Sequence, residues 1–437
     1  MNFLNDLLAS LIGRTARFID LQKLKFRELA SSLAGNARVM TLTEFNWAIP
    51  LTWIAVYSPL FMKGLGLSSV EIGLVIGLGI LTQALAAALG GVLADRWGHK
   101  RTLIIFDALG WPVAMVLFAF AQNIWWIAAA TVINNLCFVV APGWQCVFVE
   151  HTPKTKRANI YAVYQIVINL SNLAVPLAGL IVGRLGLVDG CRFIFAFTAV
   201  TTTAGILLRL AKLKDTKASI AGLKAGTARQ PLSREITEFK SAFSFIRSNS
   251  SFLWFIAVQT LVMFGLVMWG TYYPIFLADK YGLGLSASAI PVFPFVFSIV
   301  MMAVLLLFIP HVRNSQFKRF ITIGLFLVLA AMALFIVSPA HTMSFILLAS
   351  VLNGAGTAFF RPLADTYNIN AIPERARARV LSVLNTVIIL ATIPAAPLAG
   401  KLYSYEPRYA FAAVTLFLFL ALILLLAGFR PNKEKAG

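Results

Sequence analysis

The chain returns repeatedly to apolar stretches that are about as long as a membrane is thick. A helix needs roughly 20 apolar residues to cross a bilayer. Only 12% of the 437 residues are charged, against about 25% in soluble domains. Hydropathy therefore predicts an all-α integral membrane protein with twelve transmembrane helices. We expect the spans near residues 39–62, 70–93, 102–121, 124–150, 158–183, 191–211, 252–278, 287–309, 318–338, 343–369, 378–402 and 408–429.

Lysine and arginine are unequally divided between the two sides of the predicted membrane. Of 37 such residues, 30 fall before the first span, in the even-numbered loops or in the tail, with Arg209 counted in the long loop after the sixth span. Cytoplasmic segments carry an excess of these cations, so we predict a multi-pass protein of a plasma or inner membrane with both termini in the cytoplasm. The net charge of +20 then indicates anionic lipid headgroups as partners, and not nucleic acid.

A basic stretch of low hydropathy divides the spans six and six. The two halves also repeat one another: Pro142 and Pro362 lie 220 residues apart, and Pro176-Leu177-Ala178-Gly179 matches Pro397-Leu398-Ala399-Gly400 at an offset of 221. This pattern predicts duplicated bundles. The expected divisions are an amphipathic, basic cytoplasmic extension (1–36), an N-terminal six-helix bundle (37–211), a basic linker (212–250), a C-terminal six-helix bundle (251–429) and a tail (430–437).

Between the second and third spans the chain reads Gly91-Val92-Leu93-Ala94-Asp95-Arg96-Trp97-Gly98-His99-Lys100-Arg101, followed by Leu103. This segment resembles the cytoplasmic loop signature G-x-L-A-D-R-x-G-R-K-x-x-L of the major facilitator superfamily, with His99 in place of one arginine. The resemblance implies two pseudo-symmetric bundles that rock about a central site. It also places Asp95 near the start of helix 11, around Ala378.

A carboxylate is stabilised at a helix start by the unpaired N–H groups there. We therefore expect Asp95 to hold the cytoplasmic side closed in one state of the transport cycle. The basic residues of the loop can reach Glu150 or lipid phosphates, or can serve membrane orientation alone. The predicted conformational gate comprises Gly91, Asp95, Arg96, Gly98, Lys100, Arg101 and Glu150.

Ionisable residues inside spans are costly and are candidates for function. Glu44 in helix 1 is the leading candidate for a proton carrier, because the resemblance implies that helices 1, 4, 7 and 10 line the cavity. Asp365 and Asp107 are further candidates, although Asp107 in helix 3 can instead pair with loop cations. Arg361, Asp365 and Asn368 share one face of helix 10. There Arg361 and Asp365 either neutralise each other, or Arg361 binds substrate or trades partners with Glu44.

Aromatic and amide side chains complete the predicted substrate cavity. Each of these residues can alternatively make an interhelical hydrogen bond. The cavity candidates are Trp47, Asn134, Asn135, Trp144, Gln145, Gln259, Trp269, Asn353 and Arg361.

The sequence contains no recognisable enzyme motif. Its three cysteines lack metal-ligand spacing, and no phosphate-binding loop for ATP is present. We therefore expect neither a cofactor nor a bound metal. The predicted function is secondary active transport by a monomer, with protons coupled to efflux of a small organic compound. Two alternatives stay open: uptake or facilitated passage of a polar or anionic metabolite, and a non-transporting membrane sensor.

Overall fold

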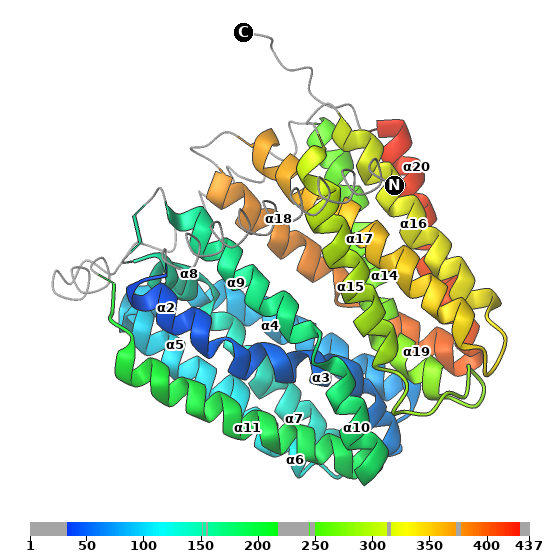
Figure 1. Cartoon of the computed structure of the whole chain (residues 1–437), viewed down its shortest axis with the longest axis horizontal. Helices are drawn as coiled ribbons and strands as arrows, with labels where there is room; N and C mark the ends of the chain where they lie inside the picture. Colours follow the sequence, from blue (N-terminus) through cyan, green and yellow to red (C-terminus); the bar gives the residue numbers. More distant parts are fainter. Residues whose placement is uncertain are drawn as a thin grey trace, which may run out of the picture.

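The computed structural model describes residues 33–150, 152–153, 156–216, 244, 250–312, 316–372 and 377–428. Within these ranges the secondary structure is helical, without strands. Most of the predicted amphipathic extension, most of the linker and the tail lie outside the described residues. Figure 1 shows the N-terminal half, coloured blue to green, beside a C-terminal half coloured green to red.

The N-terminal half begins with two helices that meet at Glu44. Its helices are α2 (Gly35–Thr43), α3 (Phe45–Gly64), α4 (Ser69–Trp97), α5 (His99–Ala108), η1 (Leu109–Val113), α6 (Ala114–Ala119), α7 (Ile124–Asn135), η2 (Leu136–Val140), α8 (Ala141–Val149), α9 (Arg157–Asn172), α10 (Val175–Leu185) and α11 (Leu187–Lys212). The short π-helix η1 contains Pro112, and the 3-10 helix η2 interrupts the fourth predicted span.

The C-terminal half follows with fewer interruptions. Its helices are α14 (Ser250–Ala278), α15 (Val292–Leu307), η4 (Ile309–His311), α16 (Phe317–Val337), α17 (Met343–Ala371), α18 (Arg377–Thr392), α19 (Ala395–Tyr405) and α20 (Pro407–Gly428).

Nine helical stretches in the described ranges are long and apolar enough to cross a membrane, and a bent pair in the fourth predicted span makes up to ten. Of the other two predicted spans, α15 has only 16 residues. The first, α3, has 20 residues, but it contains Pro50 and Pro59 and is less apolar than the nine stretches above. The helical fold is thus confirmed, while the count of twelve spans stays a prediction.

The predicted internal repeat is visible as a shared break in two helices. In the N-terminal half α9 has 16 residues and α10 has 11, and in the C-terminal half α18 and α19 have the same two lengths. The Pro-Leu-Ala-Gly segments start α10 and α19. A proline lacks the N–H of a helix interior and is tolerated in a first turn. The repeated sequence therefore produces the same broken helix twice.

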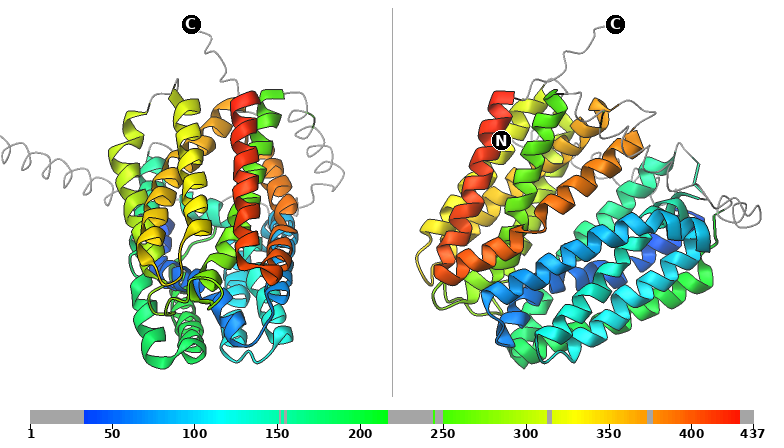
Figure 2. Two further views of the ribbon diagram at one scale, coloured as in Figure 1. Left: turned by 90° about the vertical axis from the view of Figure 1, so that its right-hand side faces the viewer. Right: turned by 180° about the vertical axis from the view of Figure 1, so that it is seen from behind.

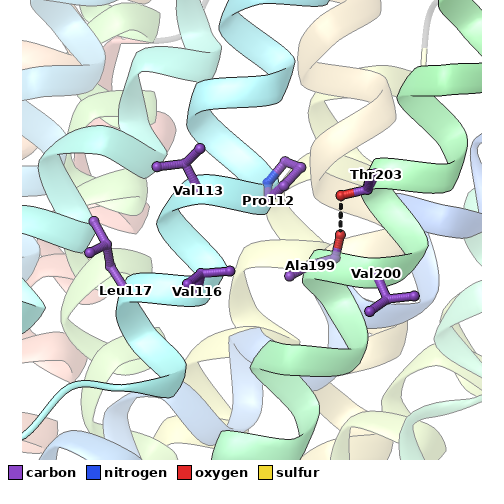
Figure 3. Close-up of a pocket in the computed structure, with 7 residues that line it drawn as sticks. All are labelled: Pro112, Val113, Val116, Leu117, Ala199, Val200 and Thr203. Carbon is purple, nitrogen blue, oxygen red and sulfur yellow. Dashed lines mark hydrogen bonds between the residues drawn. The ribbon is translucent and has the colours of Figure 1, made fainter.

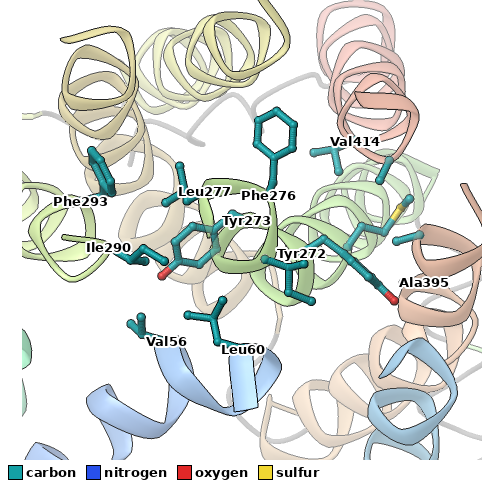
Figure 4. Packing of buried hydrophobic residues seen from close by; sticks show 14 of the residues in the cluster. Val56, Leu60, Tyr272, Tyr273, Phe276, Leu277, Ile290, Phe293, Ala395 and Val414 are labelled. Atoms are coloured by element: carbon teal, nitrogen blue, oxygen red, sulfur yellow. The ribbon is translucent and has the colours of Figure 1, made fainter. Parts of the chain in front are cut away.

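The two halves meet at the end of the molecule where α4 begins, which we call the Ser69 end. Tyr57 Oη donates to Ala287 O at 2.9 Å and Tyr272 Oη to Ser69 O at 2.7 Å. Figure 4 shows Val56 and Leu60 of α3 facing apolar residues of the other half. The two views of Figure 2 show the bundles packed side by side along this region.

Glycines permit this close packing at two positions that correspond between the halves. A Cβ atom on Gly179 of α10 would lie 2.5 Å from Ser288 O, and one on Gly400 of α19 would overlap Ser69 O. Ser69 and Ser288 are 219 residues apart, close to the offset of the repeat. The same glycine-to-backbone contact thus joins the halves twice at the Ser69 end.

Candidate functional site

A buried group of charges lies inside the N-terminal bundle, around Arg209 of α11. The arginine is 2% exposed. Its Nη2 lies 3.0 Å from Glu44 Oε2 and its Nη1 lies 3.3 Å from Asp107 Oδ2. Its Nε donates to Thr43 Oγ1 at 2.9 Å. We call Glu44, Asp107 and Arg209 the charge triad. It joins the α2–α3 junction to α5 and α11.

Aromatic side chains enclose the triad. The guanidinium carbon of Arg209 lies 3.8 Å from the centre of the Trp47 ring, a cation–π contact that is strengthened by burial. Trp47 fits against α11 because position 205 is glycine, where a Cβ would lie 2.5 Å from Trp47 Cζ3. Tyr164 Oη of α9 donates to Glu44 Oε1 at 3.0 Å. Both oxygens of Glu44 therefore have a partner.

The triad contains two carboxyl groups and one guanidinium group. Arginine stays protonated in proteins, so the triad carries one excess negative charge when both acids are ionised. Burial makes such an excess costly. Uptake of one proton by either acid makes the triad neutral and leaves Arg209 paired with the other, ionised acid. The arrangement therefore suits reversible binding of one proton.

Arg209 is the member of the triad that the sequence analysis misassigned. It was counted among the cytoplasmic cations of the linker, because Lys212 and Lys214 follow closely. The structure corrects this: α11 continues to Lys212, and Arg209 faces the bundle interior. Asp107 was expected to pair with loop cations as an alternative to proton coupling. Its partner is instead this helical arginine.

A second feature, the aromatic cavity, lies in the C-terminal bundle. It has a volume of about 150 Å³. Trp269 and Tyr273 of α14 stack with ring centres 4.4 Å apart, and Phe335 of α16 meets Trp269 edge-on at 6.2 Å. Trp269 and Asn353 were both predicted cavity residues, and the structure brings them together. The lining is Trp269, Tyr273, Phe293, Pro294, Phe297, Phe335, Ala349, Ser350 and Asn353.

Other predicted cavity residues make contacts within one bundle. Gln259 and Asn368 exchange two hydrogen bonds of 3.0 Å between α14 and α17. Asn134 Nδ2 donates to Gly110 O at 2.6 Å, and so holds α7 against η1. Asn135 Nδ2 donates to Thr131 O of its own helix at 2.8 Å.

Two more predicted cavity residues lie elsewhere in the N-terminal bundle. Trp144 stacks on Phe148 with ring centres 4.8 Å apart and tilts against Tyr164. Gln145 is exposed. Trp47, predicted as a cavity residue, is instead 4% exposed and packs on Arg209.

The predicted polar stripe of Arg361, Asp365 and Asn368 lies on α17, and its members differ in exposure. Arg361 and Asp365 are both exposed on α17. Within the described ranges, no salt bridge of 4.0 Å or less joins them. Asn368, one turn further along, is buried against Gln259. Mutual neutralisation by direct contact is thus not present in this state, and Glu44 is bound by Arg209, not by Arg361.

The predicted gate lies at the opposite end of α4 from Ser69, which we call the Asp95 end. Asp95 and Arg96 are exposed, and a Cβ on Gly91 would have no atom within 4 Å. In the part of the chain that the structure describes, Asp95 makes no hydrogen bond or ion pair. No contact of Asp95 with the described part of α18, the predicted helix 11, is present in this state, in which the Ser69 end is closed.

The rest of the gate loop binds the first residues after α11. Gly98 ends α4 with φ = 88°, which favours glycine. His99 Nδ1 lies 2.7 Å from Thr216 Oγ1, and the Lys100 backbone N–H donates to Asp215 Oδ1 at 3.2 Å. Lys100 Nζ donates to Leu210 O at 2.9 Å. The loop thus fixes the start of the linker. Arg101 is exposed and Glu150 is half-buried.

A larger groove of about 510 Å³ lies between η1–α6 and α11. Figure 3 shows its apolar lining, including Val113, Val116 and Val200, and the single polar hydroxyl of Thr203 bound to Ala199 O. Such a surface suits contact with lipid. Among the described residues, no group of three or more His, Cys, Asp or Glu side chains is placed to hold a metal ion.

Comparison with known proteins agrees with this architecture. The family model of the Major Facilitator Superfamily matches residues 39–348 and 315–437. Multidrug resistance protein 1 of Bacillus subtilis is 22% identical over 87% of this chain and 92% of its own length. The multi-drug resistance efflux pump PmrA of Streptococcus pneumoniae serotype 4 is 24% identical over 44% of this chain and 48% of its own length. The chain thus spans about half the length of that relative.

Among solved structures, a mutant of the nucleoside transporter NupG superposes with a TM-score of 0.72 at 14% identity, covering 90% of this chain and 100% of NupG. At that identity the likeness shows the fold alone. The apolar helices and the family match together describe a multi-pass integral membrane protein. The chain belongs to the major facilitator superfamily.

Proposed function

We propose that this protein is a proton-coupled secondary transporter that exports a small, partly hydrophobic organic compound by alternating access. The observation that carries the proposal is the charge triad, in which Glu44 and Asp107 share Arg209. One proton can be gained or lost there without stranding the arginine. Two relatives, a multi-drug resistance efflux pump and a multidrug resistance protein, support efflux as the direction.

Glu44 is the acid that we propose to carry the proton. It is the more accessible of the two, with 13% of its side chain exposed against 6% for Asp107. It also lies at the junction of α2 and α3, where a backbone change can follow protonation. Protonation would remove the ionic part of its bond to Arg209, while Asp107 keeps the arginine paired.

The test uses proteoliposomes loaded with a pH-sensitive dye. Adding a panel of small aromatic and aliphatic solutes should move protons in the wild type if transport is coupled. Glu44→Gln should abolish gradient-driven accumulation of a responding solute but retain counterflow exchange, because exchange needs no net protonation change. Asp189→Asn is a matched control, since that carboxyl side chain is 75% exposed. Coupled accumulation by Glu44→Gln would assign the proton to Asp107 or Asp365 instead.

A second candidate function is passage of an anionic metabolite. Arg361 favours it, because this arginine is exposed on α17 and has no salt-bridge partner within the described ranges. An anionic solute that moves down its own gradient without proton movement, and that stops moving in Arg361→Leu, would support this function over export.

We further propose that the Asp95 end is cytoplasmic, that anionic lipids contact its basic residues, and that the protein acts as a monomer. Accessibility of single cysteines on the two sides of intact cells tests the orientation. A protein whose Asp95 loop is labelled from outside would refute it.

A further inference from the structure

The aromatic cavity in the C-terminal bundle has the dimensions of a single aromatic ring. Its volume is about 150 Å³, a size at which a dry cavity in another protein accepts benzene. Trp269 and Tyr273 lie nearly parallel, at 11°, while Phe335 stands at 81° to Trp269. Aromatic groups prefer such offset and edge-on contacts. These rings hold one another in place, so the cavity beside them has a fixed aromatic wall.

One buried hydrogen-bond donor on the cavity lining lacks a partner, and an amide beside it has a free N–H group. Trp269 Nε1 is buried without a hydrogen bond. Asn353 is 3% exposed, and its Oδ1 accepts a long bond of 3.4 Å from Thr357. Within the described residues its Nδ2 donates to nothing. Ser350 is already satisfied, because its hydroxyl donates to Ile346 O at 2.9 Å. Unpaired buried donors are costly, and an acceptor on a ligand would relieve that cost.

The lining also constrains the charge of the ligand. All nine lining residues are uncharged, so a charged ring would lose its hydration without gaining a counter-ion. We propose that this cavity binds a neutral aromatic group that carries a hydrogen-bond acceptor, such as a carbonyl oxygen, as the part of the substrate held by the C-terminal bundle. This assignment rests on the proposed transport function and specifies its substrate class.

The first experiment compares two ligands of similar size on the full-length protein purified in detergent. Acetophenone has an aromatic ring and a carbonyl acceptor, whereas ethylbenzene has the ring without the acceptor. Saturation-transfer NMR titrations measure the affinity of each ligand. We expect acetophenone to bind about tenfold more tightly, the effect of one good hydrogen bond. Equal affinities, or no binding of either ligand, would overturn the proposal.

Two variants then identify the donor. Trp269→Phe keeps a ring but removes the indole N–H, and Asn353→Leu keeps volume but removes the amide. We expect at least one of them to bind the two ligands equally, with ethylbenzene affinity unchanged. Trp125→Phe is the matched control, because Trp125 is 79% exposed at the start of α7. A tenfold preference that survives in both variants would refute the assignment of these donors.

The outcome is separable from that of the transport proposal. Preferential binding of acetophenone without any solute-induced proton movement in proteoliposomes would support the cavity and refute proton coupling. Proton-coupled movement of other solutes by a protein that does not bind acetophenone would support coupling and refute the cavity assignment.

Discussion

The two bundles share a helical plan but bury different chemistry. The N-terminal bundle encloses the charge triad, with Arg209 held by two carboxylates. The C-terminal bundle contains an uncharged aromatic cavity with one buried, unpaired donor, Trp269 Nε1. Both descend from the same repeat, which still shows in the broken helices α9–α10 and α18–α19. The two halves thus share their broken-helix pattern, whereas their buried side chains differ, and we interpret them as an ion site and a solute site.

The two ends of the molecule differ in how the halves meet. At the Ser69 end, backbone atoms pack against glycines at both Gly179 and Gly400. At the Asp95 end, the predicted gate carboxylate is exposed. The triad adjoins this second end, since Arg209 lies in the last turn of α11. On the proposed function, a protonation change at the triad would therefore act near the Asp95 end.

Removal of the arginine should have the largest effect, because it strands two buried acids. We expect Arg209→Leu to destabilise the protein by about 3–5 kcal/mol. Adding Glu44→Gln and Asp107→Asn to that variant should recover much of the loss. Thermal unfolding in detergent measures both. Arg361→Leu serves as the control in the other half, where the arginine is exposed. Equal melting temperatures for the two single variants would refute the contrast between the bundles.

The next effect concerns the packing at the Ser69 end. Gly400→Ala introduces a methyl group that would overlap Ser69 O, and overpacking of this kind costs about 1–3 kcal/mol. We expect the methyl group to destabilise the state in which the Ser69 end is closed, so that spin-label distances across this end lengthen. Gly270→Ala is the matched control, because a Cβ there has no neighbour within 4 Å. Unchanged distances in Gly400→Ala would show that this contact does not set the state.

The gate should give a smaller energetic effect that is specific to one state. A carboxylate at a helix start gains on the order of 1 kcal/mol. Asp95→Asn should therefore fold with unchanged stability, since Asp95 is exposed here, yet lose most transport. Spin-label distances at the Asp95 end should show a smaller closed population. Wild-type transport with unchanged distances would remove Asp95 from the gate.

The sequence revealed the acids of the triad but not their partner. Glu44 and Asp107 stand out because they interrupt apolar spans. Arg209 sits where an apolar stretch meets Lys212 and Lys214, and the positive-inside rule assigns such a residue to the cytoplasm. The predicted span 191–211 contains Arg209, but only the course of α11 shows that its side chain faces the bundle interior. A helix traced by its 3.6-residue period to Lys212 would have given a hint of this.

The sequence also could not show which polar side chains bond to each other when they are far apart in the chain. Gln259 and Asn368 satisfy each other across 109 residues, and no local pattern indicates which amides pair and which stay free. Trp269 and Asn353, both predicted cavity residues, line one cavity in the structure, whereas their role in binding substrate stays a prediction. The eighth span was predicted over 287–309, but α15 starts only at Val292, after Pro291. The residues before it turn against α3 and α10.

The smallest effect on stability should come from the polar stripe on α17. A buried, mutually neutralising pair would lose several kcal/mol when one member is removed, but Arg361 and Asp365 are exposed and make no salt bridge within the described ranges. We therefore expect Arg361→Leu and Asp365→Leu each to change stability by no more than about 0.5 kcal/mol, and the double variant to match their sum.

Transport measurements then decide the role of Arg361 and Asp365 independently of folding. A stable, active double variant would remove both residues from the site, whereas a stable but inactive one would keep Arg361 as a substrate contact that forms when α17 approaches the N-terminal bundle. A large loss in either single variant that the double variant restores would instead show that the two charges pair in a state other than this one.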